Sequence, residues 1–197
     1  MGAWSTGGGG ARRCGCSTQS VSLWRYARGD TTISADGARA PDVRFLFRHP
    51  AHFIALGGGL GLIPFAPGTF GTLLALPIFW IAGPRLDPIV YLVALAALFV
   101  LGVWACEVTG RALGDADHGA MVWDETVAFL LVLFLTPVYS YWQAFAFVLF
   151  RVFDIAKPPP IRYYERTVKG GLGVMIDDLM AAFYTLIVLA IAKAIVN

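Results

Sequence analysis

Residues 150–178 concentrate charge in a chain in which only 14% of the residues are Asp, Glu, Lys or Arg. The charged side chains with chemistry to offer are Arg151, Asp154, Lys157, Arg162, Asp177 and Asp178. Carboxylates are ligands for hard cations, and guanidinium or ammonium groups neutralise phosphate oxygens. Charges beside apolar segments are costly, so they are usually paired or functional. The segment therefore predicts a site for a metal ion and a phosphate group at a membrane surface.

A second polar segment, residues 107–125, carries acids that could complete this site. Asp124 and Glu125 stand at the start of an apolar run, where the helix dipole favours negative charge. Neighbouring residues on a helix point about 100° apart, so at most one of the two is expected to reach the site directly. The segment also holds Asp117 and His118, and the histidine could be a metal ligand, a general acid or an ordinary loop residue.

Magnesium is the metal that this set of oxygen ligands favours. It usually takes one or two protein carboxylates and leaves the rest of its shell to water and phosphate. The candidate ligands are Asp124, Glu125, Asp154, Asp177 and Asp178. The last two precede an apolar run, so one of them is expected to cap the final helix and the other to bind the metal.

The cations predict how a phosphate would be held. Arg151, Lys157 and Arg162 would bind it, because phosphoryl transfer depends on charge stabilisation and in-line positioning. The spacing of Arg151, Asp154 and Lys157 places them on one broad helix face, where they could also simply pair with one another. The candidate catalytic groups are Asp124, Asp154, Asp178 and His118. Attack by an activated water and an aspartyl-phosphate intermediate both fit these residues.

Glycine and proline punctuate residues 45–69, which predicts a broken or re-entrant segment rather than a regular span. Pro67 then leads into a helix through Gly68 and Thr69. Their backbone N–H groups and the threonine hydroxyl could bind phosphate, because a helix N-terminus attracts anions. Packing and turn formation would account for the same residues equally well.

The elements that must position these residues are membrane helices. The 197 residues are 57% hydrophobic with a mean hydropathy of +0.66, whereas soluble domains are roughly 45–50% apolar. Apolar runs cover residues 70–82, 88–106, 126–135, 141–153 and 179–196. They predict an all-α, multi-helical integral membrane protein with about four to five membrane helices. We assign residues 45–197 to this membrane-embedded domain and residues 1–44, rich in Gly, Ser, Thr and Arg, to a flexible tail.

Charge placement predicts the topology. Residues 1–44 carry six Arg and three Asp, a net charge of +3, and residues 45–197 carry nine Lys or Arg and ten Asp or Glu, a net charge of −1. The positive-inside rule places the tail and the 151–178 segment in the cytoplasm, and alternation through five spans brings residues 107–125 to the same side. The two polar segments are therefore expected to meet. The sequence has no basic surface or motif for nucleic acid, so no such partner is predicted.

Other catalytic designs are excluded by their missing motifs. The sequence lacks the C-x5-R loop of cysteine phosphatases and the P-S-G-H segment of histidine-dependent lipid phosphatases, which leaves metal-dependent chemistry. A small ion-coupled membrane transporter is the alternative, because carboxylates, broken helices and Gly-rich segments suit one as well. A transporter should carry its acids near mid-bilayer within an internal repeat, whereas these acids flank the apolar runs and no repeat is present.

Four blocks of the chain resemble the bacterial phosphatidylglycerophosphatase A family in order and spacing: GGGLGLIPFAPGTFGTLLALP, DHGAMVWDETVAF, FRVFDIAKPPPIRYYE and VKGGLGVMIDDLMAA. The resemblance runs from about His49 to the C-terminus. It implies a magnesium-dependent phosphatase of the bacterial inner membrane with its active site facing the cytoplasm. Its phospholipid substrate would be phosphatidylglycerophosphate, converted to phosphatidylglycerol and phosphate on the route to cardiolipin. The matching positions are Pro67, Gly68, Thr69, Gly71, Asp117, His118, Asp124, Glu125, Arg151, Asp154, Lys157, Asp177 and Asp178.

Overall fold

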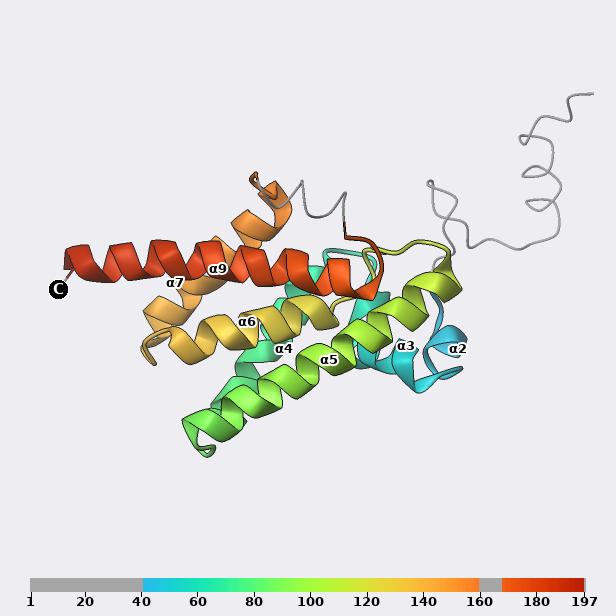
Figure 1. The fold of residues 1–197 in the computed structure, drawn as a ribbon, viewed down its shortest axis with the longest axis horizontal. Coiled ribbons are helices and arrows are strands. Elements are labelled where there is room, and N and C mark those ends of the chain that lie inside the picture. Colours follow the sequence, from blue (N-terminus) through green and yellow to red (C-terminus); the bar gives the residue numbers. More distant parts are fainter. Residues whose placement is uncertain (1–40, 160–167, 197) are drawn as a thin grey trace, which may run out of the picture.

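Helices are the only regular elements in the part of the chain that this computed structural model describes, residues 41–159 and 168–196 (Figure 1). The all-α prediction is therefore confirmed for these residues. The elements in chain order are α2 (Val43–Leu46), α3 (Pro50–Ala55), the 3-10 helix η1 (Gly57–Leu62), α4 (Pro67–Ala82), α5 (Pro88–Leu113), α6 (Trp123–Leu135), α7 (Ser140–Ala156) and α9 (Gly171–Val196).

Helix α6 lies at the centre of the bundle. It runs between α5 and α9 in the view of Figure 1, and it also contacts α4 and α7. The main apolar cluster joins Phe129 and Leu133 of α6 to Phe79 of α4, Phe150 of α7 and Ala182 of α9. A helix that is apolar on every side is stable only when other elements surround it. The four neighbouring helices therefore fix where the polar first turn of α6 can lie.

The segment before α4 is broken, as its glycines predict. Helix α3 ends at Ala55, and the backbone then turns through Gly57, Gly58 and Gly59 with φ angles of 56°, 69° and 109°. These angles lie in the left-handed region, which glycine occupies without a steric penalty. The first described helix, α2, begins at Val43, two residues before the boundary predicted for the tail.

The polar helix ends gather at one end of the bundle. Arg151 near the end of α7 contacts Glu125 at the start of α6, with Nη1 2.9 Å from Oε1. Glu107 near the end of α5 accepts a 2.6 Å hydrogen bond from the N–H of Gly171, where α9 starts. Gly68 at the start of α4 lies directly against the carboxylate of Glu125. Three helices thus begin, and two end, at the same place.

Helix α9 begins earlier than the sequence indicates. The predicted helix covers residues 179–196 with Asp177 or Asp178 as its cap, but α9 starts at Gly171, so both acids lie inside it. The prediction that one of them caps the helix is wrong. Gly170, at a φ of 83°, turns the chain into the helix, and the carboxylate of Glu107 accepts the first N–H.

Two of the described helices are long and apolar enough to cross a membrane, α5 and residues Gly171–Ile195 of α9. Large apolar side chains cover their outward faces, among them Val93 and Val100 on α5 and Phe183 on α9. Soluble proteins rarely expose contiguous apolar surface of this extent, whereas lipid tails would cover it.

The predicted count of four to five spans is not confirmed. Helix α6, for example, has 13 residues. At about 1.5 Å per residue it is about 20 Å long, against about 30 Å for the hydrocarbon core of a bilayer. Among the described helices, length and composition thus identify two candidate spans, and α4, α6 and α7 are shorter than these.

Val100 tests whether α5 faces lipid, because its side chain is 68% exposed. An aspartate near the middle of a spanning helix costs about 2.5–3.5 kcal/mol of insertion free energy. We expect Val100→Asp to reduce severalfold the protein retained in alkali-washed membranes, and Val100→Leu to leave it unchanged. Equal retention of the two variants would mean that this face of α5 does not contact lipid.

Candidate active site

Arg151 links two of the predicted site carboxylates. Its Nη1 atom lies 2.9 Å from Oε1 of Glu125 on α6 and 2.7 Å from Oδ2 of Asp154, one turn further along α7. The Arg151 and Glu125 side chains are only 16% and 13% exposed, so water screens their interaction weakly. The buried Nε atom of Arg151 has no hydrogen-bond partner among the described residues. This donor could therefore bond an anion that entered the site.

Lys157 joins the two polar segments. It follows the last residue of α7 and adopts a left-handed conformation, with a φ of 39°. Its Nζ atom lies 3.5 Å from Oδ2 of Asp117 and 3.6 Å from Oδ2 of Asp177. The contact with Asp117 confirms the prediction that residues 107–125 and 151–178 meet. Pro158 follows and keeps the helix from continuing, which the run of prolines predicts.

Asp124 and Asp178 are the most deeply placed acids of the site, at 6% and 5% exposure. Oδ1 of Asp124 and Oδ2 of Asp178 have no hydrogen-bond partner among the described residues. The carboxyl group of Asp178 also lies within hydrogen-bonding reach of Asp154. An unsatisfied hydrogen bond at a buried polar atom costs on the order of 1–3 kcal/mol, and an unpaired buried charge costs more. A cation bound to these two oxygen atoms would remove that cost.

Electrostatics agree with that reading at the first turn of α6, which precedes the apolar part of the helix. Burial raises the pKa of Asp124 well above its usual range, and the neighbouring charge of Glu125 raises it further. Burial also raises the pKa of Glu125 to about 7, against the opposing effect of Arg151. Both carboxyl groups therefore lose their protons less readily than exposed acids do, and a nearby cation would favour their charged forms.

The described side chains do not by themselves build a complete metal shell. No group of three or more His, Cys, Asp or Glu side chains between residues 41 and 159 or 168 and 196 is arranged to hold a metal ion. Glu125 and Asp154 contact Arg151, and Asp177 contacts Lys157. The metal-ligand assignment therefore stays a prediction: the acids converge, and the structure pairs some of them with cations.

The start of α4 supports Glu125. A Cβ atom on Gly68 would overlap the Glu125 carboxylate, and one on Gly71 would come within 2.7 Å of Val122. The hydroxyl of Thr72 donates to the carbonyl of Gly68 at 2.9 Å and lies 3.4 Å from Oε2 of Glu125. Glycines at both positions thus let α4 approach α6 closely enough to hold the carboxylate.

Phosphate binding by this turn stays a prediction. Gly68 contacts Glu125, and the N–H of Thr69 donates to the carbonyl of Ala66 at 3.0 Å. Sequence reasoning missed the supporting role of Thr72. Its signal is the spacing of Gly68, Gly71 and Thr72, which places all three on one helix face.

The remaining predicted residues lie at the rim or outside the described chain. Nδ1 of His118 accepts a 3.2 Å hydrogen bond from the N–H of Ala120, a local contact that shapes the loop before α6. Asp117 reaches the site through Lys157. Arg162 lies outside the described residues.

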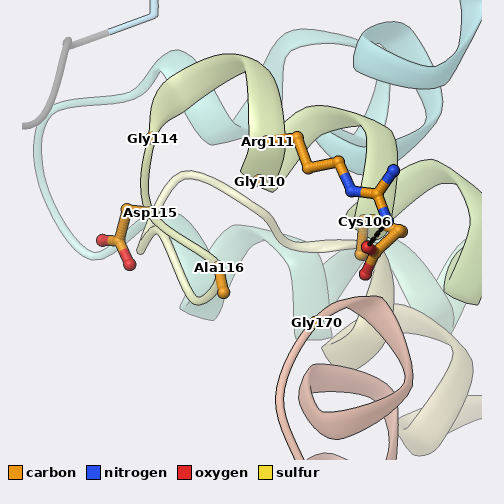
Figure 2. A pocket seen from close by; sticks show the side chains of 8 residues that line it. Cys106, Gly110, Arg111, Gly114, Asp115, Ala116 and Gly170 are labelled. Atoms are coloured by element: carbon orange, nitrogen blue, oxygen red, sulfur yellow. Dashed lines mark ion pairs between the residues drawn. The ribbon is translucent and has the colours of Figure 1, made fainter.

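Two cavities open beside this loop. One, of about 260 Å³, is lined by Asp117, Lys169 and Asp177 among others, so it borders the acids paired with Lys157. The other, of about 300 Å³, lies between the end of α5 and the start of α9. Figure 2 shows it, with Arg111 on one wall and Asp115 and Gly170 on others. The cavity of about 260 Å³ is the closer of the two to the site carboxylates, because Asp117 and Asp177 line it.

Comparison with known proteins identifies a family. Residues 53–193 match the family model described as phosphatidylglycerophosphatase A. The phosphatidylglycerophosphatase A of Haemophilus influenzae is 44% identical over 141 residues, which cover 71% of this chain and 86% of the relative. That of Escherichia coli is 40% identical over 139 residues, covering 70% and 80%. No solved structure matches the chain.

A third relative carries a different name. A protein of Bacteroides thetaiotaomicron, named as a candidate phosphatidylinositol-3-phosphatase, is 41% identical over 152 residues. The match covers 73% of this chain and 94% of that protein. All three names describe phosphatases that act on a lipid phosphate.

The Arg151 bridge should matter to stability. Arg151→Gln would leave Glu125 and Asp154 buried without their cation, and breaking a buried pair on one side typically costs about 3–5 kcal/mol. We expect a clear fall in the midpoint of thermal unfolding in detergent. Adding Glu125→Gln should recover part of the loss, because it removes one uncompensated charge. A double variant that is less stable than Arg151→Gln alone would contradict the bridge.

Gly68 offers a matched pair of variants. The methyl group of Gly68→Ala would collide with the Glu125 carboxylate, whereas no atom lies within 4 Å of a Cβ placed on Gly119. We expect Gly68→Ala to lower the unfolding midpoint and Gly119→Ala to leave it unchanged. Overpacking of this kind typically costs about 1–3 kcal/mol. Equal midpoints would mean that α4 does not press against Glu125.

Proposed function

This chain belongs to the phosphatidylglycerophosphatase A family, and we propose that it hydrolyses phosphatidylglycerophosphate to phosphatidylglycerol and inorganic phosphate. The reaction breaks the bond between phosphorus and the glycerol oxygen; phosphate gains a water oxygen, and the glycerol oxygen gains a proton. The product would enter the synthesis of phosphatidylglycerol and cardiolipin.

One observation carries the proposal. Unpartnered carboxylate oxygens of Asp124 and Asp178 lie in the same cluster as Arg151 and Lys157. Oxygen ligands for a cation beside fixed positive charges are the components that phosphoryl transfer uses. The cluster lies at one end of an apolar bundle, where the headgroup of a membrane lipid could reach it.

Magnesium is the cofactor that we propose. The two unpartnered oxygens are hard donors, and two protein carboxylates suffice for this metal when water and phosphate complete the shell. Asp124 and Asp178 would hold it, and Asp154, which lies within reach of Asp178, would be the next ligand. When bound, the ion would polarise the phosphate and offset its negative charge.

The chain's own cations would orient the phosphate. Two carboxylates hold Arg151, and its buried Nε–H has no described partner, so this donor would bond a phosphate oxygen that reached it. Lys157 contacts Asp117 and Asp177, two acids that line the cavity of about 260 Å³. It would neutralise the phosphate as the headgroup enters.

Two routes of attack on phosphorus are compatible with these residues. Asp124, Asp154 or Asp178 could take the proton from an attacking water, or one of them could attack phosphorus itself and form an aspartyl-phosphate. The configuration at phosphorus, followed with an isotopically chiral phosphate ester, separates the routes, because a single attack by water inverts it whereas two successive displacements at phosphorus retain it.

We further propose that the protein lies in the bacterial inner membrane with its polar end facing the cytoplasm. The excess of arginine before residue 45 supports this orientation through the positive-inside rule. The transporter alternative is less well supported. Asp124 lies in the first turn of α6 and Arg151 in the last turns of α7, so the charges gather at helix ends rather than at mid-helix.

A second substrate is worth testing because of one relative. The Bacteroides thetaiotaomicron protein is named for phosphatidylinositol 3-phosphate, and 94% of its length is matched by this chain. Both lipids present a phosphomonoester on a headgroup, so the same carboxylates and cations could act on either.

Phosphate release from phosphatidylglycerophosphate in mixed micelles tests the proposal directly. We expect release with magnesium, none with EDTA, and slower release from phosphatidylinositol 3-phosphate. Asp124→Asn, Asp154→Asn and Asp178→Asn should each reduce turnover by about 100-fold or more, as loss of a key catalytic interaction does. If all three variants fold and keep full magnesium-dependent activity, the assigned site is wrong.

Faster hydrolysis of phosphatidylinositol 3-phosphate than of phosphatidylglycerophosphate would instead mean that the inositol lipid is the better substrate. No release from either lipid with any divalent metal would favour a transporter.

A further inference from the structure

Glu107 connects the end of α5 to the start of α9 and stands apart from the candidate catalytic acids. Its Oε2 atom accepts the N–H of Gly171 at 2.6 Å. Its Oε1 atom lies 2.6 Å from Nη2 of Arg111, the ion pair drawn as a dashed line in Figure 2. Both carboxylate oxygens are therefore engaged, which separates Glu107 from the unpartnered acids of the site.

The contact replaces a cap that α9 cannot provide for itself. Gly170, the residue before the helix, has no side chain that could accept the first N–H groups. An uncapped first turn leaves backbone donors unsatisfied, and a carboxylate at a helix N-terminus also interacts favourably with the helix dipole. Here that carboxylate comes from another helix, so the cap ties α9 to α5 as well as ending it.

Two glycines make the close approach possible. A Cβ atom on Gly170 would overlap Oε2 of Glu107, and one on Gly171 would overlap the carbonyl oxygen of Val103. One turn further along α9, Met175 packs against Gly102, where a Cβ would lie 2.7 Å from its sulfur. The two helices are thus held together from Gly102 to Glu107.

The site depends on where this contact holds α9. Asp177 and Asp178 lie six and seven residues after Gly171, within the same continuous helix. A shift of α9 by one residue would move them by about 1.5 Å along the axis and turn them by about 100°. Asp177 would then leave Lys157, and Asp178 would leave Asp154.

We propose that Glu107 is a positioning residue, whose carboxylate clamps the start of α9 onto α5 and thereby holds Asp177 and Asp178 in the site. The expected effect of this clamp on catalysis assumes the proposed phosphatase function. Its structural consequence, an ordered first turn of α9, can be measured without any substrate. A cavity of about 300 Å³ borders the contact, so water could replace a lost cap but could not hold the helix in place.

Three variants separate the clamp from other roles. Glu107→Ala removes the acceptor, Glu107→Gln keeps an acceptor oxygen without the charge, and Arg111→Ala removes the exposed partner but leaves the bond to Gly171. For Glu107→Ala we expect kcat to fall by about tenfold or more, because misplaced catalytic groups slow chemistry, while KM stays within about twofold. Glu107→Gln should restore most of kcat, and Arg111→Ala should match the wild type.

Amide hydrogen exchange gives the second readout. Peptides that cover residues 171–178 should exchange faster in Glu107→Ala than in the wild type, Glu107→Gln or Arg111→Ala. Gly171→Ala keeps the Glu107 side chain but adds a methyl group that would collide with the backbone of α5 at Val103 and Glu107, so it should reproduce both the faster exchange and the lower kcat. Unchanged exchange in Glu107→Ala overturns the clamp.

A loss of kcat in Glu107→Gln as large as in Glu107→Ala also overturns the proposal, because the charge rather than the cap would then matter. An equal loss in Arg111→Ala would assign the effect to the ion pair and overturn it as well. If the wild type releases no phosphate from any lipid, the proposed function fails. The exchange data then still decide whether Glu107 orders α9.

Discussion

Buried carboxylates need compensating positive charge, and the polar end of this bundle is organised by that need. Two cations, Arg151 and Lys157, stand among six acids: Asp117, Asp124, Glu125, Asp154, Asp177 and Asp178. In an apolar surrounding, an ionised group without a partner is strongly unfavourable. The cations pair with some of these acids, and burial raises the pKa of Asp124 and Glu125. Among the described residues the charges are thus incompletely compensated, and a divalent cation and a phosphate together could compensate them.

Close helix packing is what brings the charges together. On one side, Gly68 and Gly71 let α4 press against α6 until Glu125 is held from behind. On the other, Gly170 and Gly171 let α9 approach the backbone of α5. Small residues allow helix backbones to approach closely, which is how helices associate where the hydrophobic effect is weak. Glycine thus supports the polar end of the bundle through packing on both flanks.

The sequence was a good guide to local chemistry and a poorer one to distant contacts. Spacing left open that Arg151 pairs with Asp154, which it does, and charge at the ends of apolar runs predicted that the polar segments meet. The sequence placed Asp177 or Asp178 at a helix cap, because a helix start fixed by a carboxylate 64 residues away leaves no local signal. For the same reason, nothing in the sequence distinguishes Glu107 from the other residues of its polar segment. Contacts between helices depend on tertiary packing, which no single stretch of sequence encodes.

Because α9 starts early, Asp177 and Asp178 lie below the end of the helix that carries them. Asp178 lies level with Asp154 of α7, yet the helix that carries it continues seven residues further toward the polar end. At about 1.5 Å per residue, that overhang stands about 10 Å above the carboxylates. With the loop that carries Asp117, it lines the cavity of about 260 Å³. A phosphate at the tip of a slim, flexible arm could enter such a cavity. A phosphate set directly on a broad ring would have to bring the ring with it, so the width of the group that bears the phosphate would become a criterion for selection.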